Sequence, residues 1–177
     1  MSLPLQMGCA TSDPDLATRT ASGDPEALGQ LYQRHGAMLI QLASRLLGSR
    51  ADGEDVVQDV FVGLPEALSG YRDDGRLTGW LRRVTINHAL KRMRTVRRRR
   101  ETALETASAT AAPNETDAGV VRRAVHALPD RLRTVVVLKL VEGYSHEEIG
   151  ALLGISRGAS EVRLSRALRA LRTSLGE

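Results

Sequence analysis

The sequence predicts an all-α protein made of two small helical domains joined by a flexible linker. Apolar residues recur every three or four positions along most of the chain, between residues that commonly begin and end helices. Residues 101–118 interrupt this pattern, because they are rich in Thr and Ala, carry four acids and contain no aromatic residue. We expect a disordered leader over residues 1–12, one domain over 13–100, the linker over 101–118 and a second domain over 119–177.

The first long helix is expected to begin at Asp24-Pro25, where an N-cap residue precedes a proline at the first helical position. Gly48 is expected to end it, since glycine is common just beyond the last helical turn. The spacing of the apolar residues supports one continuous helix between these two points. They are Leu28, Leu31, Met38, Leu42, Leu46 and Leu47.

A second helix is expected from about Gly53, with apolar residues on one face and acids on the other. Residues 51–70 carry five acids and no base. Pro65 falls inside the pattern, where its ring would clash with the preceding turn, so we expect a kink or a restart there. The acids on the polar face are Asp52, Asp55 and Asp59.

The next helix, from Thr78, is strongly basic. Residues 76–100 carry ten bases and no acid, and such a density favours contact with phosphates. Trp80 lies near the start of this helix, where it can anchor the core or contact nucleic acid.

The second domain contains the signature of a helix-turn-helix. Ser145 and Glu148 are spaced as a capping box that opens a short apolar helix, and Gly154 ends it. Ser156 can then cap a last helix that is rich in arginine. A basic helix placed after such a turn can lie in the major groove of DNA.

Composition excludes several classes of protein. No uninterrupted apolar run approaches the ~20 residues that span a bilayer, and the first ten residues lack the pattern of an export signal, so we expect a cytoplasmic protein. Cys9 is the single cysteine and the four histidines are scattered, so we expect neither a metal site nor a cofactor.

Two sets of residues resemble one known family. The string Glu54 to Phe61 (EDVVQDVF), with Trp80-Leu81 and Asn87 to Leu90 (NHAL), is similar to the sigma-two domain of the extracytoplasmic-function sigma factors of bacterial RNA polymerase. The segment from Leu128-Pro129 through EGYSHEEI to LLGIS is similar to their sigma-four domain. The resemblance covers nearly the whole chain from Asp15 onward, in the order typical of the family.

The resemblance implies a function without catalytic chemistry, with core RNA polymerase and promoter DNA as partners. The acidic helix would dock on the coiled coil of the polymerase's largest subunit through Asp55, Gln58 and Asp59. The loop and basic helix would bind the melted −10 strand. Members of the family are often held inactive by an anti-sigma protein, although no residue here identifies one. The implied −10 residues are Tyr71, Arg76, Trp80, Arg83, Asn87, His88, Lys91 and Arg92.

The last helix would contact the −35 element as duplex DNA. Its implied contacts are Arg157, Ala159, Ser160, Glu161, Arg163 and Arg166. Here Ala159-Ser160-Glu161 replace a common Thr-Val-Lys, while Lys91 replaces a usual aspartate and Pro65 a common tryptophan. Glu161 can accept a hydrogen bond from cytosine N4, or it can be an acid tolerated at the edge of the groove.

Other function classes share parts of this pattern. A stand-alone helix-turn-helix regulator would have the same carboxy-terminal motif, but it needs no acidic docking helix and usually carries a ligand or phosphoacceptor domain. An enzyme acting on nucleic acid would need clustered carboxylates or metal ligands. The acids at 52–59 are not accompanied by a phosphate-binding loop or a histidine partner, so we expect no enzyme. Taken alone, this acidic face is more often simply solvated.

Overall fold

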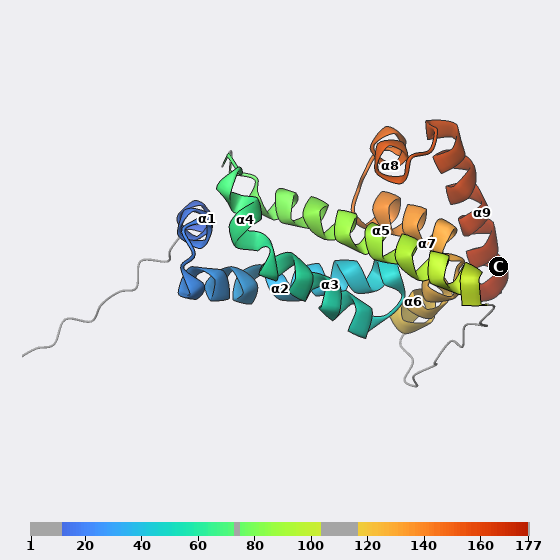
Figure 1. Ribbon diagram of the computed structural model, residues 1–177. Helices are drawn as coiled ribbons and strands as arrows, with labels where there is room; N and C mark the ends of the chain where they lie inside the picture. Colours follow the sequence, from blue (N-terminus) through green and yellow to red (C-terminus); the bar gives the residue numbers. More distant parts are fainter. Residues whose placement is uncertain (1–11, 73–74, 104–116, 177) are drawn as a thin grey trace, which may run out of the picture.

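The computed structural model describes residues 12–72, 75–103 and 117–176, and these parts of the chain are helical without a strand (Figure 1). The helices form an amino-terminal half, residues 12–103, and a carboxy-terminal half, residues 117–176. The expected leader, except for Ser12, and most of the expected linker lie outside the described residues. The described helices extend to Ala103 and start again at Asp117, so both reach into the ends of the expected linker.

The amino-terminal half begins with a helix that the sequence analysis did not predict, α1 (Asp13–Ala21). Ser12 caps it by accepting a hydrogen bond from the backbone N–H of Asp15. The Asp13 carboxylate also binds the next helix, since it accepts from Arg34 and lies 3.0 Å from Nε2 of the buried His35. These contacts hold α1 across α2 and α4 at one end of the molecule (Figure 1).

The long helix α2 (Pro25–Leu47) has the ends that the sequence predicted. One carboxylate oxygen of Asp24 accepts from the backbone N–H groups of Glu26 and Ala27, at 2.9 and 3.2 Å. Gly48 ends the helix in the left-handed conformation, with φ of 74°. Both caps depend on residues adjacent to the helix, which is why the sequence alone could place them.

Two helices follow, of which α3 (Arg50–Val62) lies in close contact with α2 and α4 (Leu64–Ser69) packs against α1 and α3. Ser49 caps α3, and the chain restarts as α4 with Pro65 in its first turn, so the restart expected there is confirmed. Gly53 allows α3 to approach α2 closely, because a Cβ at this position would lie 2.3 Å from Oγ of Ser44 and 2.7 Å from its backbone nitrogen.

The basic helix α5 (Leu77–Ala103) packs along α2 and α3 and completes the amino-terminal half. The interior contains side chains from all five helices. The largest fully buried ones are Leu16, Leu31, Leu39, Leu42, Leu46, Val56, Val57, Leu64, Leu81 and Ile86.

The carboxy-terminal half consists of α6 (Asp117–Ala127), α7 (Asp130–Val136), a π-helical turn η1 (Val137–Val141), α8 (His146–Leu153) and α9 (Arg157–Leu175). The sequence predicted one helix over 132–141, whereas the structure winds the last turn of that segment as a π-helix. The capping box is confirmed: Ser145 Oγ accepts from the Glu148 N–H, and the Glu148 carboxylate accepts from the Ser145 N–H at 2.7 Å.

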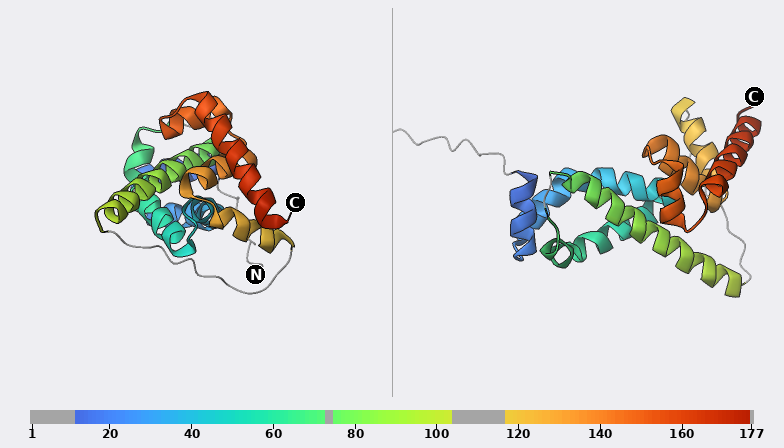
Figure 2. Two further views of the ribbon diagram at one scale, coloured as in Figure 1. Left: turned by 90° about the vertical axis from the view of Figure 1, so that its right-hand side faces the viewer. Right: turned by 90° about the horizontal axis from the view of Figure 1, so that it is seen from above.

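The two halves pack against each other at the carboxy-terminal end of α2, which is remote from α1 (Figure 2). Arg133, on α7, is 5% exposed and donates to the carbonyls of Leu46 and Leu47 in the last turn of α2, both at 3.1 Å. The same guanidinium donates to the carbonyls of His126 and Leu128 in its own half and to Asp130. One side chain therefore satisfies carbonyls of both halves.

Candidate nucleic-acid interface

The acidic face of α3 is exposed where the sequence placed it. Asp55, Gln58 and Asp59 are all exposed, while Val56 and Val57 on the opposite side are buried in the core. Helical spacing of three and four residues brings the polar groups onto one side. The face is open to solvent, and its Asp55 also pairs with Arg92 of α5.

The neighbouring helix α5 exposes a basic and polar surface. Arg83, Asn87, His88 and Lys91 are exposed along its length, at spacings that place them on neighbouring turns. Between α3 and α5 lies a groove of about 460 Å³. Its lining combines residues of the expected docking face and of the expected −10 surface: Val56, Asp59, His88, Lys91, Arg92, Thr95 and Val96.

Arg92 differs from its neighbours because the acidic helix binds it. Its Nη2 donates to Asp52 Oδ1 at 2.6 Å and to Asp55 Oδ2 at 3.0 Å, and its Nε donates to Asp52 Oδ1 at 3.1 Å. The hydrogen bond with Asp52 is the main reason why the pKa of Arg92 is raised above its ordinary value. The expected docking face and the expected −10 surface therefore share an ion pair.

Trp80 is partly buried and partly exposed. Its ring is half-buried against the core and lies 5.0 Å from the ring of Tyr71, with 48° between their planes. Arg76, just before α5, is exposed. Asp73 and Asp74 of the intervening loop lie outside the described residues. The aromatic pair stands at the amino-terminal end of the basic helix, with one part in the core and one part exposed.

The expected recognition helix, α9, begins at Ser156, whose Oγ accepts from the Ala159 N–H at 3.1 Å. Gly154 adopts the left-handed conformation in the turn, and a Cβ on Gly150 would lie 2.7 Å from the carbonyl oxygen of Ile155. Glycine at these two positions allows the sharp turn between α8 and α9. The helix-turn-helix geometry is thus built from local contacts.

The expected −35 residues do not all face outward. Arg157, Glu161 and Arg166 are exposed, and Ala159 and Arg163 are partly buried. Ser160 is fully buried, and its Oγ lies 2.9 Å from Nδ1 of His146 on α8. In this arrangement Ser160 joins the two helices of the motif.

Glu161 is engaged within the protein. It accepts a hydrogen bond from Arg157 Nε at 2.9 Å, and Arg157 also donates to Glu147 on α8 at 2.9 Å. The bond from Arg157 is the main reason why the pKa of the Glu161 carboxyl lies below its ordinary value. The spacing of four residues between Arg157 and Glu161 is a signal from which this pair could have been predicted.

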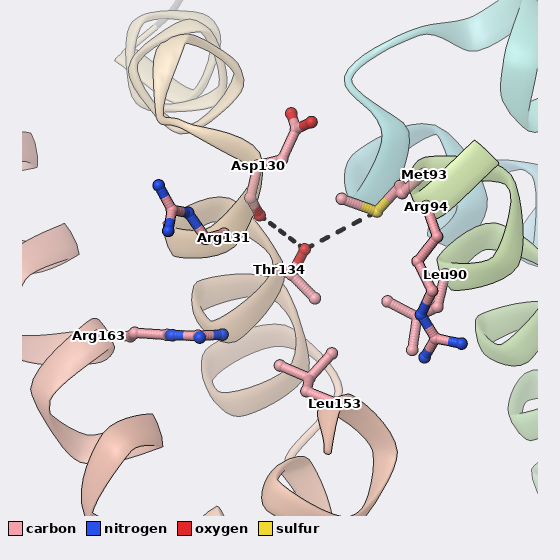
Figure 3. Close-up of a pocket in the computed structure, with 8 residues that line it drawn as sticks. All are labelled: Leu90, Met93, Arg94, Asp130, Arg131, Thr134, Leu153 and Arg163. Atoms are coloured by element: carbon pink, nitrogen blue, oxygen red, sulfur yellow. Dashed lines mark hydrogen bonds between the residues drawn. The ribbon is translucent and has the colours of Figure 1, made fainter. Parts of the chain in front are cut away.

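Sequence reasoning missed the residues that join the two halves. Arg133 is one, and Glu142 is another, because its side chain is 2% exposed and accepts from Arg82 of α5 at 2.9 Å. A cleft of about 150 Å³ lies beside this junction (Figure 3). Thr134 Oγ1 donates there to the Asp130 carbonyl at 2.7 Å and lies 3.9 Å from Sδ of Met93. The lining is Leu90, Met93, Arg94, Asp130, Arg131, Thr134, Leu153 and Arg163.

Other kinds of site were also sought. In the parts of the chain that the structure describes, no group of three or more His, Cys, Asp or Glu side chains is placed to hold a metal ion. Within those same parts, no helix has the length and apolar character needed to cross a membrane.

Two family models match the chain in the order of its two halves. The model described as Sigma-70 region 2 matches residues 31–100, which include α3 and most of α5. The model described as Sigma-70, region 4 matches residues 118–171, which include the helix-turn-helix.

Known proteins are similar over nearly the whole chain. RNA polymerase sigma factor CarQ of Myxococcus xanthus is 35% identical over 169 residues, which cover 90% of this chain and 95% of CarQ. ECF RNA polymerase sigma factor SigM of Mycobacterium tuberculosis is 32% identical over 168 residues, or 93% of this chain and 85% of SigM. The solved structure of sigma factor RpoE with the anti-sigma factor NepR, from Bartonella quintana, has a TM-score of 0.60 at 23% identity and covers 84% of this chain and 96% of that chain, a likeness of fold.

Proposed function

Because this chain belongs to the extracytoplasmic-function sigma factors of the sigma-70 family and directs transcription initiation by RNA polymerase, we propose that its two halves divide promoter recognition between them. The amino-terminal half docks on core polymerase and binds the −10 element as a single strand. The carboxy-terminal half binds the −35 element as duplex. The chain itself performs no catalysis, and it works in the cytoplasm, where bacterial RNA polymerase transcribes.

The docking surface is the exposed face of α3, formed by Asp55, Gln58 and Asp59. Its partner is the coiled coil of the polymerase's largest subunit, as the family resemblance implies. Buried Val56 and Val57 on the opposite face fix the rotation of α3, so the acids project away from the core. Complementary charge speeds encounter and selects the partner more than it adds raw affinity.

The −10 surface is the exposed side of α5 together with the aromatic pair at its start. Trp80 and Tyr71 offer partly exposed rings, on which unpaired bases can stack. Arg76, Arg83, Asn87, His88 and Lys91 supply cations and hydrogen-bond donors along the strand's path. A half-buried ring is firmly oriented by the core, so it can hold a base at little entropic cost.

The −35 surface is the exposed side of α9. Arg157 and Arg166 project outward with Arg163 partly covered, and such a helix fits the major groove. Partly buried Ala159 and exposed Glu161 lie in the first turns of the helix, while Ser160 positions α9 through His146.

An anti-sigma protein is a further partner that we propose, by analogy with the RpoE structure. The cleft between the halves has an apolar floor of Leu90, Met93 and Leu153, and three arginines line it. An acidic amphipathic segment would match this lining in both respects.

The observation that supports the division best is that one chain presents an exposed acidic helix, a basic helix beside it and a helix-turn-helix. The test is run-off transcription with bacterial core RNA polymerase on a genomic library. Specific transcripts that require the chain are expected, and Asp55→Arg combined with Asp59→Arg should weaken polymerase binding and reduce those transcripts. A chain that binds promoter DNA but never core polymerase would instead be a stand-alone regulator.

A further inference from the structure

Arg92 is held in a way that its neighbours on α5 are not. Three hydrogen bonds join its guanidinium to Asp52 and Asp55, and its side chain is 32% exposed. Lys91 and His88, which line the same groove, are exposed and form no ion pair with the residues that the structure describes. The strongest cation contact of this groove is therefore made to the protein's own acidic helix.

The two acids differ in what else they can do. Asp52 lies in the first turn of α3, where its charge is favourable to the helix, and its side chain is 40% exposed. Asp55 is 57% exposed and belongs to the face proposed to dock on the polymerase. A basic group of the polymerase that reaches Asp55 must therefore compete with Arg92 for the same carboxylate.

We infer that Arg92 belongs to both binding surfaces: in the free chain Asp52 and Asp55 of α3 hold it, and polymerase docking on Asp55 frees part of its guanidinium for the phosphates of the open promoter strand while Asp52 still binds it. This inference rests on the proposed function for the identity of the two ligands. A guanidinium bound to two carboxylates offers little net charge to a phosphate, because the three groups together carry one negative charge. When Asp55 finds a cation on the polymerase, the remaining pair is neutral and Arg92 has donors to spare.

The consequence is coupling between the two sites. If docking strengthens strand binding by some factor, strand binding must strengthen docking by the same factor, because the coupling free energy is reciprocal. A partly exposed ion pair is worth about 0.2–1 kcal/mol, which corresponds to a change of roughly 1.4- to 5-fold in affinity. The effect is modest, but it links polymerase docking to binding of the opened promoter strand.

The first experiment measures the dissociation constant of the full chain for a short fluorescein-labelled oligothymidine by anisotropy at low salt. Asp55→Asn should tighten binding about two- to fivefold, because the part of the Arg92 guanidinium that Asp55 holds becomes available. Glu54→Gln is the matched control, since it removes one charge from the adjacent position of α3, where the carboxylate pairs with Arg50. It should change the affinity much less.

The decisive comparison repeats Asp55→Asn in an Arg92→Gln background. If Asp55 acts through Arg92, the gain in oligothymidine affinity should disappear in the Arg92→Gln background, since the guanidinium that Asp55 holds is absent. If the gain persists, or if Glu54→Gln produces an equal gain, the effect is one of general charge and the inference is wrong.

A second experiment measures binding to core RNA polymerase. Arg92→Gln should strengthen docking about twofold, because Asp55 loses its competitor, whereas Arg94→Gln, an equal change of charge on the same helix, should not match it. Weaker docking of the Arg92 variant would overturn the inference. If the unaltered chain fails to bind core polymerase at all, the proposed function fails, and the oligothymidine cycle still decides whether Asp55 masks Arg92.

Discussion

The two halves of the molecule bury their apolar side chains in different ways. The amino-terminal half surrounds a core to which all five of its helices contribute buried side chains. The carboxy-terminal half has a small cluster of its own, built on Leu128, Val136 and Ala167. Its other buried hydrophobic residues join the core of the first half: Val135, Val137, Leu138 and Ile149.

This difference indicates that the carboxy-terminal half depends on the junction for part of its stability. Small domains bury a lower fraction of their surface and are correspondingly marginal. Packing α7 and α8 on the other half adds apolar burial that a helix-turn-helix of this size lacks. The same junction must loosen if the two DNA-binding helices are to reach elements more than a helical turn apart on a promoter.

The largest expected effect is that of removing the side chain that joins the halves. Arg133→Met would leave carbonyls of both halves without a partner, among them those of Leu46 and Leu128. Each buried acceptor left unpaired costs about 1–3 kcal/mol. Urea unfolding should show this loss, and amide exchange should increase first in α6 to α9.

Arg131→Met provides the control for that change, because Arg131 is exposed on the same helix. Its free energy of unfolding should stay close to that of the unaltered chain. If amide exchange in the Arg133 variant rises equally in both halves, the carboxy-terminal half does not depend on the junction more than its neighbour does.

The next prediction tests how tightly the amino-terminal half is packed. Gly53→Ala would place a Cβ within 2.7 Å of the Ser44 backbone nitrogen, so α2 and α3 would have to separate. Overpacking of this kind costs typically ~1–3 kcal/mol. Thermal unfolding followed by circular dichroism would measure it.

Gly29→Ala is the matched comparison on α2, since nothing lies within 4 Å of a Cβ at that position. Alanine there should stabilise the helix by roughly 0.5–1 kcal/mol. Equal effects at Gly29 and Gly53 would mean that the close approach of α2 and α3 is not a constraint.

Local signals explain which parts of the fold could be predicted. Asp24, Gly48, Ser145 and Ser156 act on backbone groups a few residues away, so the sequence located the helix ends correctly. The helix α1 was missed although Ser12 caps it and Pro14 lies in its first turn, a local signal of the same kind as Asp24-Pro25. Its packing on α4 depends on residues more than 40 positions along the chain.

In the candidate site, too, the features set by local spacing could be predicted and those set by long-range packing could not. The exposed acids of α3 followed from helical spacing, whereas the burial of Ser160 depends on where α8 packs, and a small polar residue is compatible with either face. Arg133 could not be assigned a role across the halves, since its acceptors at Leu46 and Leu47 lie 87 and 86 residues away.

A smaller effect is expected at the cap of the helix-turn-helix. Ser145→Ala removes the acceptor of the Glu148 N–H, and the loss of an N-cap costs typically ~1 kcal/mol. The change should lower the unfolding midpoint slightly and weaken −35 binding by loosening α8. Ser145→Asp retains an acceptor and should restore most of the stability. If it does not, the side chain at this position matters for another reason than capping.

The smallest effect concerns pH at the junction, where His126 lies half-buried and interacts with the backbone of Gly48. Burial lowers the pKa of His126 below its ordinary value, more than the bond with Gly48 raises it. The unfolded chain therefore binds a proton more readily than the folded one, so this residue weakens folding as the pH falls below about 6.5, the ordinary pKa of histidine, and contributes no such loss above it.

His126→Gln should consequently reduce the drop in unfolding midpoint between neutral pH and pH of about 5, a window above the titration of most carboxylates. His88→Gln, at an exposed position of α5 outside this junction, is the comparison, and His126→Gln should reduce the drop more than it does. Because His126 lies at the junction, the loss of stability in acid should appear first as faster amide exchange in α6 and α7. An equal loss in α2 and α3 would mean that the acid sensitivity belongs to the whole molecule and that the carboxy-terminal half has no special dependence on this contact.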